Sequence, residues 1–304
     1  MKSNIIRSEV GFRRTPAIAF FFSLFFTGLG QVYNGNFSKG LIFFILRILS
    51  LLVIPLYLFI NGKDFSVFFT VPVIATHLLI LIVSPLEALY AASKKNHFNL
   101  QWFNSVMFYF LYSAVFSALL VSSCLLVSGL FSIEKIYADN MNPGLIRGDF
   151  VLINKFNIKS ADIGDIVRFS YGGITATGRI VAKKDEIVEI KGNDISINNT
   201  LLSYSIINKN DAEKMNIADF HDLFFEINRG KKYAVILAGE AYEEKTAIKQ
   251  YIIGDDELLI ASDKRIGEDL FIKTGTDMLS GIIQGIIYSK NLRKLFSKPY
   301  LPSE

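Results

Sequence analysis

The chain has 304 residues, of which 51% are hydrophobic and 13% aromatic, and its mean hydropathy is +0.36. This composition excludes an ordinary soluble protein and favours a membrane protein with an attached polar domain. Residues 1–133 hold nine Lys and Arg against three Asp and Glu, whereas the rest of the chain holds 23 basic and 25 acidic residues. Because the polar part has no excess of basic residues that could bind phosphate groups, we expect no nucleic acid among its partners. The single cysteine, Cys124, excludes an intrachain disulfide.

Four apolar runs lie in the N-terminal part of the chain. Runs 40–60, 66–92 and 103–133 each reach the roughly 20 residues that a helix needs to cross the hydrocarbon core, so we expect three spans. The earlier run, 17–33, is shorter and ends in a stretch that contains glycines. It fits a fourth span, a re-entrant segment or an interfacial helix, and no small-residue cleavage site of a signal peptide follows it. We therefore assign residues 1–133 to an α-helical membrane region.

Basic residues around these runs predict the orientation in the membrane, because Lys and Arg are enriched in cytoplasmic loops. If run 17–33 does not fully cross and the next three runs do, these basic residues share the cytoplasmic side. The polar part then begins on the opposite side. If run 17–33 does cross, the charged N-terminus has to lie outside, against this bias. The basic residues concerned are Lys2, Arg7, Arg13, Arg14, Lys39, Lys94 and Lys95.

Residues 134–289 change to short alternating or β-branched runs, such as DFVLINKF, DIVRFSY and KYAVILAG. Turn signals such as Asn-Pro-Gly, Gly-Asp and Gly-Gly separate these runs. The pattern predicts a mainly β domain with a more helical or irregular insert at about 203–229, followed by a basic tail at 290–304. No metal-ligand spacing and no glycine-rich phosphate loop occurs in the sequence, so we expect neither a metal nor a cofactor.

Four sequence blocks of this domain carry a resemblance to a known family. NMNPGLIRGDFVLINK (140–155) resembles the block of bacterial signal peptidase I in which a nucleophilic Ser precedes Met-x-Pro and a Gly-Asp opens the next strand. Upstream, GLGQVYNGNFSKG (28–40) resembles a membrane hairpin motif that precedes some domains of this family, with Thr27 in place of a Pro. Three later blocks of the family are similar, in the same order, to IGDIVRF (163–169), GRIVAKKDEIVEIKGNDISINN (178–199) and DDELLIASDKR (255–265).

The resemblance implies a Ser/Lys peptidase that cleaves exported precursors after small side chains, at the outer face of the bacterial cytoplasmic membrane. A Lys serves as base where an apolar site keeps it neutral, and a Ser attacks when such a base takes its proton. Both groups are replaced in this sequence. The nucleophile position, immediately before Met141, is Asn140, and the base position, immediately before Arg179, is Gly178. A carboxamide and a hydrogen atom cannot perform these two steps.

Further positions of the family's pattern are also substituted. Ala138 stands where a Ser often helps to bind the oxyanion, and Glu268 stands where a Ser orients the Lys. Leu270 and Ile272 replace a closing Asp-x-Arg. The resemblance retains a scaffold of Met141, Pro143, Leu145, Gly148, Asp149, Gly164, Asp165, Arg179, Asp263 and Arg265.

The resemblance also implies where a signal peptide would bind. In the family the peptide adds as an extended strand beside the segment that leads into the nucleophile, which is IEKIYAD (133–139) here. Backbone groups make these contacts, so they can persist when the reacting side chains are lost. The predicted peptide-binding residues are Ile136, Tyr137, Ala138 and Asp139.

Three hypotheses about function follow. The first is an inactive, multi-pass membrane protein of the signal peptidase I family whose extracytoplasmic β domain still binds signal peptides or exported precursors. The second is an active signal peptidase with displaced catalytic groups, although a displacement of roughly 1 Å already damages catalysis. The third is a structural or assembly protein of the cell envelope. The lipid bilayer is a partner in all three. The nearest candidates for displaced groups are Ser160, Ser170, Lys183 and Lys184. The two lysines belong to the charged run KKDE, and such a run indicates a hydrated turn.

Overall fold

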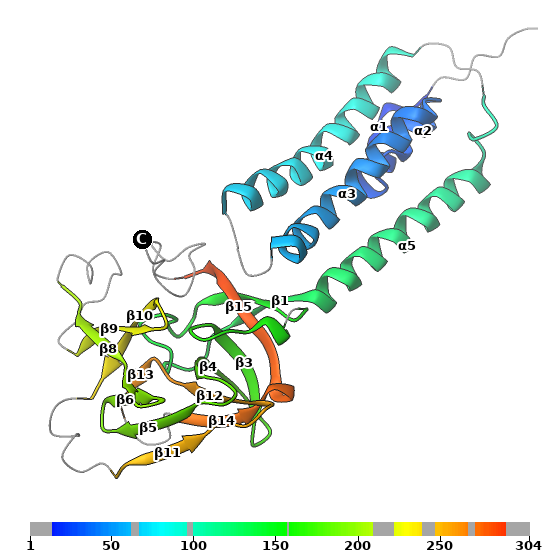
Figure 1. Cartoon of the computed structure of the whole chain (residues 1–304). Helices are drawn as coiled ribbons and strands as arrows, with labels where there is room; N and C mark the ends of the chain where they lie inside the picture. Colours follow the sequence, from blue (N-terminus) through cyan, green and yellow to red (C-terminus); the bar gives the residue numbers. More distant parts are fainter. Residues whose placement is uncertain are drawn as a thin grey trace, which may run out of the picture. The chain divides into compact units, whose positions relative to one another are not determined.

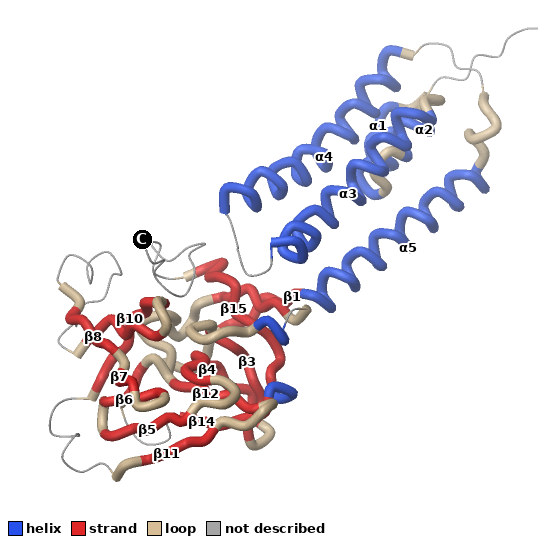
Figure 2. Tube along the Cα trace, in the orientation of Figure 1, coloured by secondary structure: helices blue, strands red, loops and turns tan. Residues whose placement is uncertain are grey.

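The computed structural model describes residues 14–61, 67–95, 100–156, 158–208, 222–238, 247–266 and 271–289. The chain divides into a helical unit and a β unit, and the boundary between them follows Ser128. Figure 2 shows this division, with helices in one unit and nearly all strands in the other. The prediction of a helical N-terminal region followed by a mainly β domain is confirmed, and the structure adds that the strands pair mostly antiparallel.

The described part of the helical unit contains three long helices and two short ones (Figure 1). Two stretches, Pro72–Lys94 and Val106–Leu130, are long and apolar enough to cross a membrane, judged by length and composition. Most of their residues are not buried inside the structure, with 22% and 11% of the two apolar windows buried. The helices are α1 (Pro16–Phe25), α2 (Leu29–Tyr33), α3 (Phe37–Asn61), α4 (Val67–Lys94) and α5 (Val106–Leu130).

Helices α1 and α2 form a hairpin that occupies the apolar run 17–33. The Thr15 N–H donates to the Tyr33 hydroxyl at 3.3 Å, so the start of α1 lies beside the end of α2. Gly28 has a φ of +94° at the turn, and a Cβ there would lie 2.1 Å from the Gly40 carbonyl oxygen. A side chain at this position is therefore excluded by both conformation and space. Run 17–33 is therefore a helical hairpin and not one continuous helix.

Polar side chains of the hairpin motif attach it to α4. The Gln31 amide donates to the Ser84 carbonyl oxygen at 2.7 Å and to Glu87 at 3.0 Å. Asn34 donates to the Ala88 carbonyl oxygen at 2.7 Å. These bonds satisfy buried polar groups that would be costly in an apolar setting. The motif GLGQVYNGNFSKG therefore has a packing role in this structure.

The boundary between helix and strand differs from the sequence prediction. The expected span 103–133 includes residues that begin the β unit, because α5 ends at Leu130 and β1 (Phe131–Lys135) follows directly. Strand β1 pairs antiparallel with β2 (Phe150–Asn154) along its whole length. The prediction that the β domain begins at 134 was wrong by about one helical turn, since an apolar helix end and an apolar strand have the same composition.

In the described residues, the β unit contains a seven-stranded sheet and two four-stranded sheets. The large sheet has the order β1-β2-β15-β3-β4-β12-β14, and its neighbours are antiparallel. The remaining strands of this sheet are β3 (Ile166–Tyr171), β4 (Ile174–Ala182), β12 (Glu257–Ala261), β14 (Phe271–Gly275) and β15 (Leu279–Tyr288). Two 3₁₀ turns, η1 (Ile158–Ser160) and η3 (Thr276–Met278), accompany it.

The two smaller sheets lie beside the large one in Figure 1. One has the order β11-β5-β6-β7, and the other has the order β13-β10-β9-β8. Alternation of apolar residues, as in β5, buries every second side chain in a shared core. The strands are β5 (Ile187–Lys191), β6 (Asp194–Ile197), β7 (Thr200–Leu201), β8 (Ser203–Ile206), β9 (Leu223–Asn228), β10 (Lys231–Leu237), β11 (Lys249–Ile252) and β13 (Lys264–Arg265).

The insert predicted at 203–229 is not irregular at its ends. Both ends are strands, β8 and β9, which pair with each other in antiparallel register. Leu223 and Phe225 bury on one face of this sheet, which explains why the segment is extended. The middle of the insert, 209–221, and the predicted basic tail, 290–304, lie outside the described residues.

Candidate functional site

A loop that follows β1 forms one side of the candidate site. The Ile136 N–H donates to the Asp149 carbonyl oxygen at 2.8 Å, and the Gly148 N–H donates to the Ile136 carbonyl oxygen at 2.8 Å. These two bonds close the loop. Met141 and Leu145 are fully buried inside it, and the Leu145 N–H donates to the Met141 carbonyl oxygen at 2.8 Å. The apolar residues of the motif therefore form the core of the loop.

Other retained motif residues fix the end of this loop. Gly148 has a φ of +103°, a left-handed conformation that glycine adopts without strain. The Asp149 carboxylate accepts the Ile146 N–H at 3.0 Å and the Ser289 hydroxyl at 2.6 Å. Pro143 is buried after a cis peptide bond. These residues have local structural roles that do not depend on a reacting group nearby.

Asn140 connects the loop to neighbouring strands. Its Nδ2 donates to the Thr177 carbonyl oxygen on β4 at 2.8 Å. Its own carbonyl oxygen accepts the Lys264 N–H at 2.9 Å and the Ser262 hydroxyl. Segments that are 37 and 122 residues away in the sequence therefore meet at Asn140. The position that the resemblance assigns to the nucleophile thus lies beside the strand that carries the position assigned to the base.

Gly178 follows Thr177 on β4 and is buried. A Cβ at this position would lie 2.4 Å from Ile260 Cγ2, 3.2 Å from the Ala261 carbonyl oxygen and 3.4 Å from the Phe169 ring. The first of these distances is far inside van der Waals contact, so the Ile260 side chain fills the space where a side chain would begin. The base position lacks an amine, and in this packing it also lacks room for one.

Arg179 and Asp263, both retained from the family's pattern, form a buried ion pair. Arg179 Nε donates to Asp263 Oδ1 at 2.7 Å, and Nη2 donates to Oδ2 at 2.5 Å. Nη1 donates to the Gly164 carbonyl oxygen at 2.7 Å, and the guanidinium lies 4.2 Å from the centre of the Tyr233 ring. This bidentate geometry holds β4 to the segment after β12. Breaking such a pair leaves a buried charge without a partner.

A second buried ion pair lies next to the first. Arg265 donates to both oxygens of Glu226 on β9, and the Tyr233 hydroxyl donates to Glu226 Oε1 at 2.6 Å. Burial raises the pKa of Tyr233, and the charge of Glu226 raises it further. Sequence reasoning missed Glu226 and Tyr233. The available signal was a lone carboxylate in the apolar run LFFEIN, which is unusual unless a cation pairs with it.

Gly164 and Asp165 form the turn before β3. Gly164 has a φ of +84°, and a Cβ there would lie 2.8 Å from Lys231 Cδ. The Asp165 carboxylate accepts the Asp162 N–H at 2.7 Å. This turn presents the Gly164 carbonyl oxygen to Arg179, so the second motif block also supports the buried ion pair.

The candidates for displaced catalytic groups do not gather at Asn140. Lys183 lies 3.3 Å from Asp162, and Lys184 lies 2.6 Å from Asp255. Hydrogen bonding and charge attraction to Asp255 raise the pKa of Lys184, which favours the protonated form and not the base. Lys183 is six residues beyond Thr177, or about 20 Å along an extended strand. Ser160 lies in η1, and Ser170 lies on the exposed end of β3.

The predicted peptide-binding residues divide into two groups. Ile136 is buried, and its N–H and C=O are both used inside the loop, so its backbone has no group left to pair with a peptide. Tyr137, Ala138 and Asp139 are exposed. Within the described residues, the backbones of Tyr137 and Ala138 make no hydrogen bond. In the described residues, β12 pairs with β4 from Arg179 onward, and no strand pairs with this edge of the first part of β4.

Other predicted positions can be placed in part. Glu268 and Leu270 lie outside the described residues. Ile272 pairs with Ile260 across β14 and β12 and packs against the same apolar cluster. An apolar residue therefore serves as core where the family's pattern has a closing Arg. In the described parts of the chain, no group of His, Cys, Asp and Glu could hold a metal ion.

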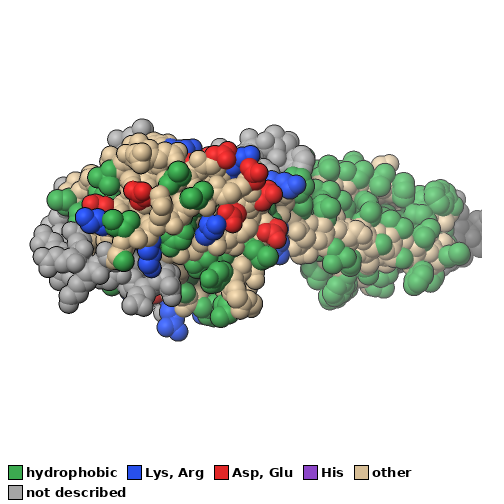
Figure 3. Space-filling view, turned by 60° about the horizontal axis from the view of Figure 1, so that its bottom comes forward, with side chains coloured by type: hydrophobic (Ala, Val, Ile, Leu, Met, Phe, Trp, Pro, Cys, Tyr) green, Lys and Arg blue, Asp and Glu red, His purple; other side chains and the backbone are tan. Residues whose placement is uncertain are grey.

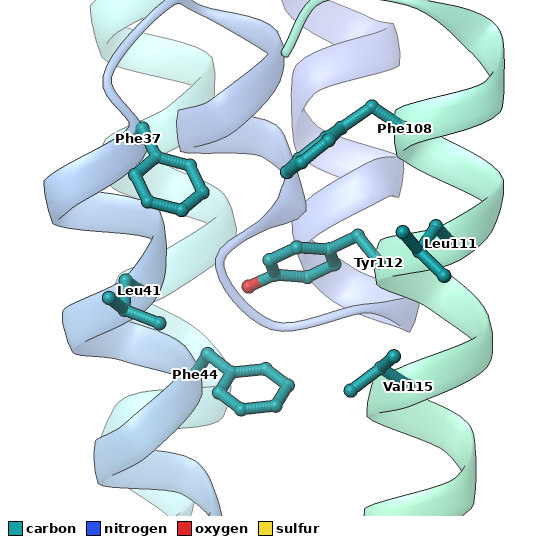
Figure 4. A pocket seen from close by; sticks show the side chains of 7 residues that line it. All are labelled: Phe37, Leu41, Phe44, Phe108, Leu111, Tyr112 and Val115. Atoms are coloured by element: carbon teal, nitrogen blue, oxygen red, sulfur yellow. The ribbon is translucent and has the colours of Figure 1, made fainter.

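The helical unit contains an apolar cavity of about 220 Å³ between α3 and α5. Figure 4 shows side chains from the two helices facing each other across it. The Tyr112 hydroxyl donates to the carbonyl oxygens of Thr27 and Gly40 at 3.0 and 3.3 Å, so it is already engaged. The cavity offers packing space and no reacting group. Its lining residues are Phe37, Leu41, Phe44, Phe108, Leu111, Tyr112 and Val115.

Comparison with known proteins agrees with this geometry. The family described as "Signal peptidase, peptidase S26" matches residues 107–266, which is just over half of the chain. The chain therefore belongs to the peptidase S26 family of signal peptidases. The match begins within α5 and extends past Arg265, so it includes both substituted positions and both buried ion pairs. No curated protein matches the chain.

Proposed function

We propose that the chain is a membrane-integrated member of the S26 family that has lost peptidase activity and retains binding of signal peptides or exported precursors. The loss of activity rests on the two substituted positions. Asn140 has no hydroxyl, and Gly178 has neither an amine nor the space for one, because Ile260 occupies it. Without a nucleophile and a base, the acyl transfer expected of the family has no chemical route at this point.

Membrane integration is supported by the surface of the helices. Figure 3 shows apolar side chains over the helical part, while charged side chains gather on the β part. Helices α4 and α5 expose large apolar residues such as Leu79, Ile82, Met107 and Phe110. A soluble protein would bury such residues, whereas lipid covers them without cost. The basic residues Lys39 and Lys94 support an orientation in which these helix ends face the cytoplasm and the β unit lies on the other side of the membrane.

Peptide binding is supported by free backbone edges close to Asn140. Tyr137 and Ala138 present backbone groups without partners in the described structure, and no described strand pairs with this edge of the first half of β4, where Asn140 occupies the Thr177 carbonyl oxygen. An extended peptide could pair with such edges through main-chain hydrogen bonds, which do not require the lost side chains. Exposed Tyr137 and Ile174, 74% and 72% accessible, offer apolar contacts beside these edges.

Photocrosslinking tests the binding proposal. A photoreactive amino acid at Tyr137 should crosslink precursor peptides that have small residues near the cleavage site, and scrambled peptides should react less. The matched control is the same label at Ile252, which is similarly exposed but lies in the sheet of β11. Equal crosslinking at both positions, or no preference over scrambled peptides, would favour a structural role in the cell envelope.

Displaced catalysis is the second candidate function. The ion pair of Lys184 argues against it, because Asp255 raises the pKa of this lysine and so favours the protonated form. Lys183 pairs with Asp162, away from Asn140. The serine and the lysine that lie beside Asn140 are already engaged, since the Ser262 hydroxyl donates to the Asn140 carbonyl oxygen and Lys264 Nζ lies 3.8 Å from Asp139. We therefore rank it below loss of activity.

A further inference from the structure

The apolar cavity between α3 and α5 opens toward the outside of the helical unit. Tyr112 forms its floor and is buried. Leu41, Leu111 and Val115 form its rim, and all three are exposed. Figure 4 shows the lining side chains of the two helices around one open space. The cavity is therefore a groove in the apolar surface of the helices and not an enclosed void.

Contacts between aromatic rings fix the two walls of this cavity. At one end, the ring centres of Phe37 and Phe108 lie 6.0 Å apart. At the other end, the ring centre of Phe44 lies 5.5 Å from that of Tyr112 and 5.6 Å from that of Phe116. Aromatic pairs at such distances attract each other. Because the walls touch at both ends, the space between them is preformed.

The size of the cavity determines what can occupy it. Its volume is about 220 Å³, and it extends from Phe37 to Phe44 on one helix, which is about 10 Å along the axis. An apolar cavity of about 150 Å³ holds a six-carbon ring, so this cavity holds a chain of about nine carbon atoms. A transmembrane helix is about 10–12 Å across and is too wide. The cavity therefore fits a single hydrocarbon chain.

The chemistry of the lining agrees with a hydrocarbon occupant. Among the lining residues the one polar side-chain group is the Tyr112 hydroxyl, which already donates to the carbonyl oxygens of Thr27 and Gly40. A water molecule would find too few hydrogen-bond partners there. Atoms that line an empty space lose dispersion contacts. An apolar chain that enters from the surrounding membrane restores these contacts.

Trp102 marks the end of the cavity that lies near the membrane surface. Its side chain is exposed, and its ring centre lies 6.3 Å from that of Phe37 and 5.4 Å from that of Phe108. Tryptophan is enriched at the boundary between membrane and water, where its ring lies at the level of the lipid headgroups. The cavity therefore extends from the headgroup level into the apolar part of the helices.

The same end of the helical unit is basic. Lys39 follows Phe37 by two residues in α3. Lys95 Nζ donates to the carbonyl oxygen of Asn34, three residues before Phe37. Residues 1–133 hold nine Lys and Arg against three Asp and Glu, so the net charge of this part of the chain is positive. Basic residues at the membrane surface attract anionic lipids.

We infer that this cavity binds one acyl chain of an anionic phospholipid, with the headgroup at the basic end beside Trp102. The preformed walls and the volume select a single chain, and the charge of this end selects an anionic headgroup. The inference rests on the proposed membrane integration. It goes beyond the proposed peptide binding, because the site lies entirely in the helical unit.

Quenching of fluorescence by brominated lipids tests this inference, because Trp102 is the single tryptophan of the chain. The full chain is reconstituted in phosphatidylcholine vesicles with a small, increasing fraction of phosphatidylglycerol that is brominated near its ester groups. A bound chain places bromine beside Phe37 and Phe108, close to Trp102. Quenching should saturate, and half of it should need about fivefold less phosphatidylglycerol than equally brominated phosphatidylcholine. Unlabelled phosphatidylglycerol should restore the fluorescence.

Two substitutions that fill the cavity should remove the saturable quenching. Val115→Phe adds a ring from α5, and Leu41→Phe adds one from α3; a six-carbon ring takes up most of this volume. Val121→Phe is the matched control, because Val121 is an exposed residue of α5 that does not line the cavity. This control should be quenched like the unmodified chain. Circular dichroism establishes that each variant keeps its helices.

Three results would overturn the inference. The first is quenching of the unmodified chain that rises in proportion to the brominated lipid without saturation. The second is saturable quenching that persists in both cavity-filling variants. The third is equal quenching by the two brominated lipids. Carbonate extraction separates these outcomes from failure of the proposed function, since a chain that carbonate releases from membranes is not membrane-integrated.

Discussion

Replacing Gly178 by Ala should destabilise the β unit, and the cause should be contact with Ile260. The added methyl group would lie 2.4 Å from Ile260 Cγ2 and 3.2 Å from the Ala261 carbonyl oxygen. Extra carbon atoms in a packed core cost about 1–3 kcal/mol. The Ala261 oxygen belongs to the backbone of a paired strand, so relief has to come from movement of the Ile260 side chain.

A second substitution isolates this contact. Ile260 is 2% exposed, and Ile260→Ala alone should cost about 2–5 kcal/mol because it leaves a cavity in the core. It also removes the Cγ2 atom that blocks position 178. In the Ile260→Ala background, Gly178→Ala should therefore cost clearly less, because the contacts that remain are at 3.2 Å from the Ala261 carbonyl oxygen and 3.4 Å from the Phe169 ring. The two substitutions should be non-additive by about 1–3 kcal/mol.

The free energies of unfolding can be measured on the full chain in detergent, with thermal unfolding followed by circular dichroism. Hydrogen–deuterium exchange of peptides from β4 and β12 would localise the effect. If Gly178→Ala costs the same free energy in both backgrounds, Ile260 does not fill the space at Gly178. The steric argument for a closed base position would then be wrong.

Three further predictions concern activity, stability and topology. Restoring the reacting groups with Asn140→Ser and Gly178→Lys should leave precursor cleavage near background. Adding Ile260→Ala, Ala138→Ser and Glu268→Ser should raise the cleavage rate clearly, since an oxyanion donor alone contributes about 10²–10³-fold. Equal rates for the two variants would refute this order. Asp263→Asn should lower the free energy of unfolding by about 3–5 kcal/mol, because it leaves Arg179 buried without its counter-charge, and a loss below about 1 kcal/mol would contradict a buried ion pair. Reporter fusions at Asn199 and Asn96 should give extracytoplasmic and cytoplasmic signals respectively, and a cytoplasmic signal at Asn199 would reverse the proposed orientation.

The sequence was sufficient to predict the general architecture. Apolar runs of helical length and short alternating runs differ clearly in pattern, so the helical region and the β domain were both recognisable. The order of the four motif blocks also indicated that Asn140 and Gly178 belong to one site, and Asn140 indeed bonds to Thr177, next to Gly178. The start of β1 was not predictable, because Phe131 and Ile133 fit a helix end as well as a strand.

Other parts of the site depended on contacts that the sequence does not reveal. Ile260 meets Gly178 through the pairing of β12 with β4, which contains an irregularity between Leu259 and Ile260. The sequence gives no signal for such a shift in register. Glu226 reaches Arg265 from β9, within the segment that was interpreted as an irregular insert. Contacts between strands that are distant in the sequence become visible only in the three-dimensional structure.

Loss of peptidase activity is tested most directly by incubating the purified, unmodified chain with a precursor that carries a cleavable signal peptide. We expect no product above the uncatalysed background, and no change when Ser160, Ser170, Lys183 or Lys184 is replaced by Ala. The precedent for removing both members of a catalytic unit is a loss of about a million-fold in turnover. Cleavage at the small-residue site by the unmodified chain, abolished by one of these four replacements, would contradict the account and establish a displaced active site.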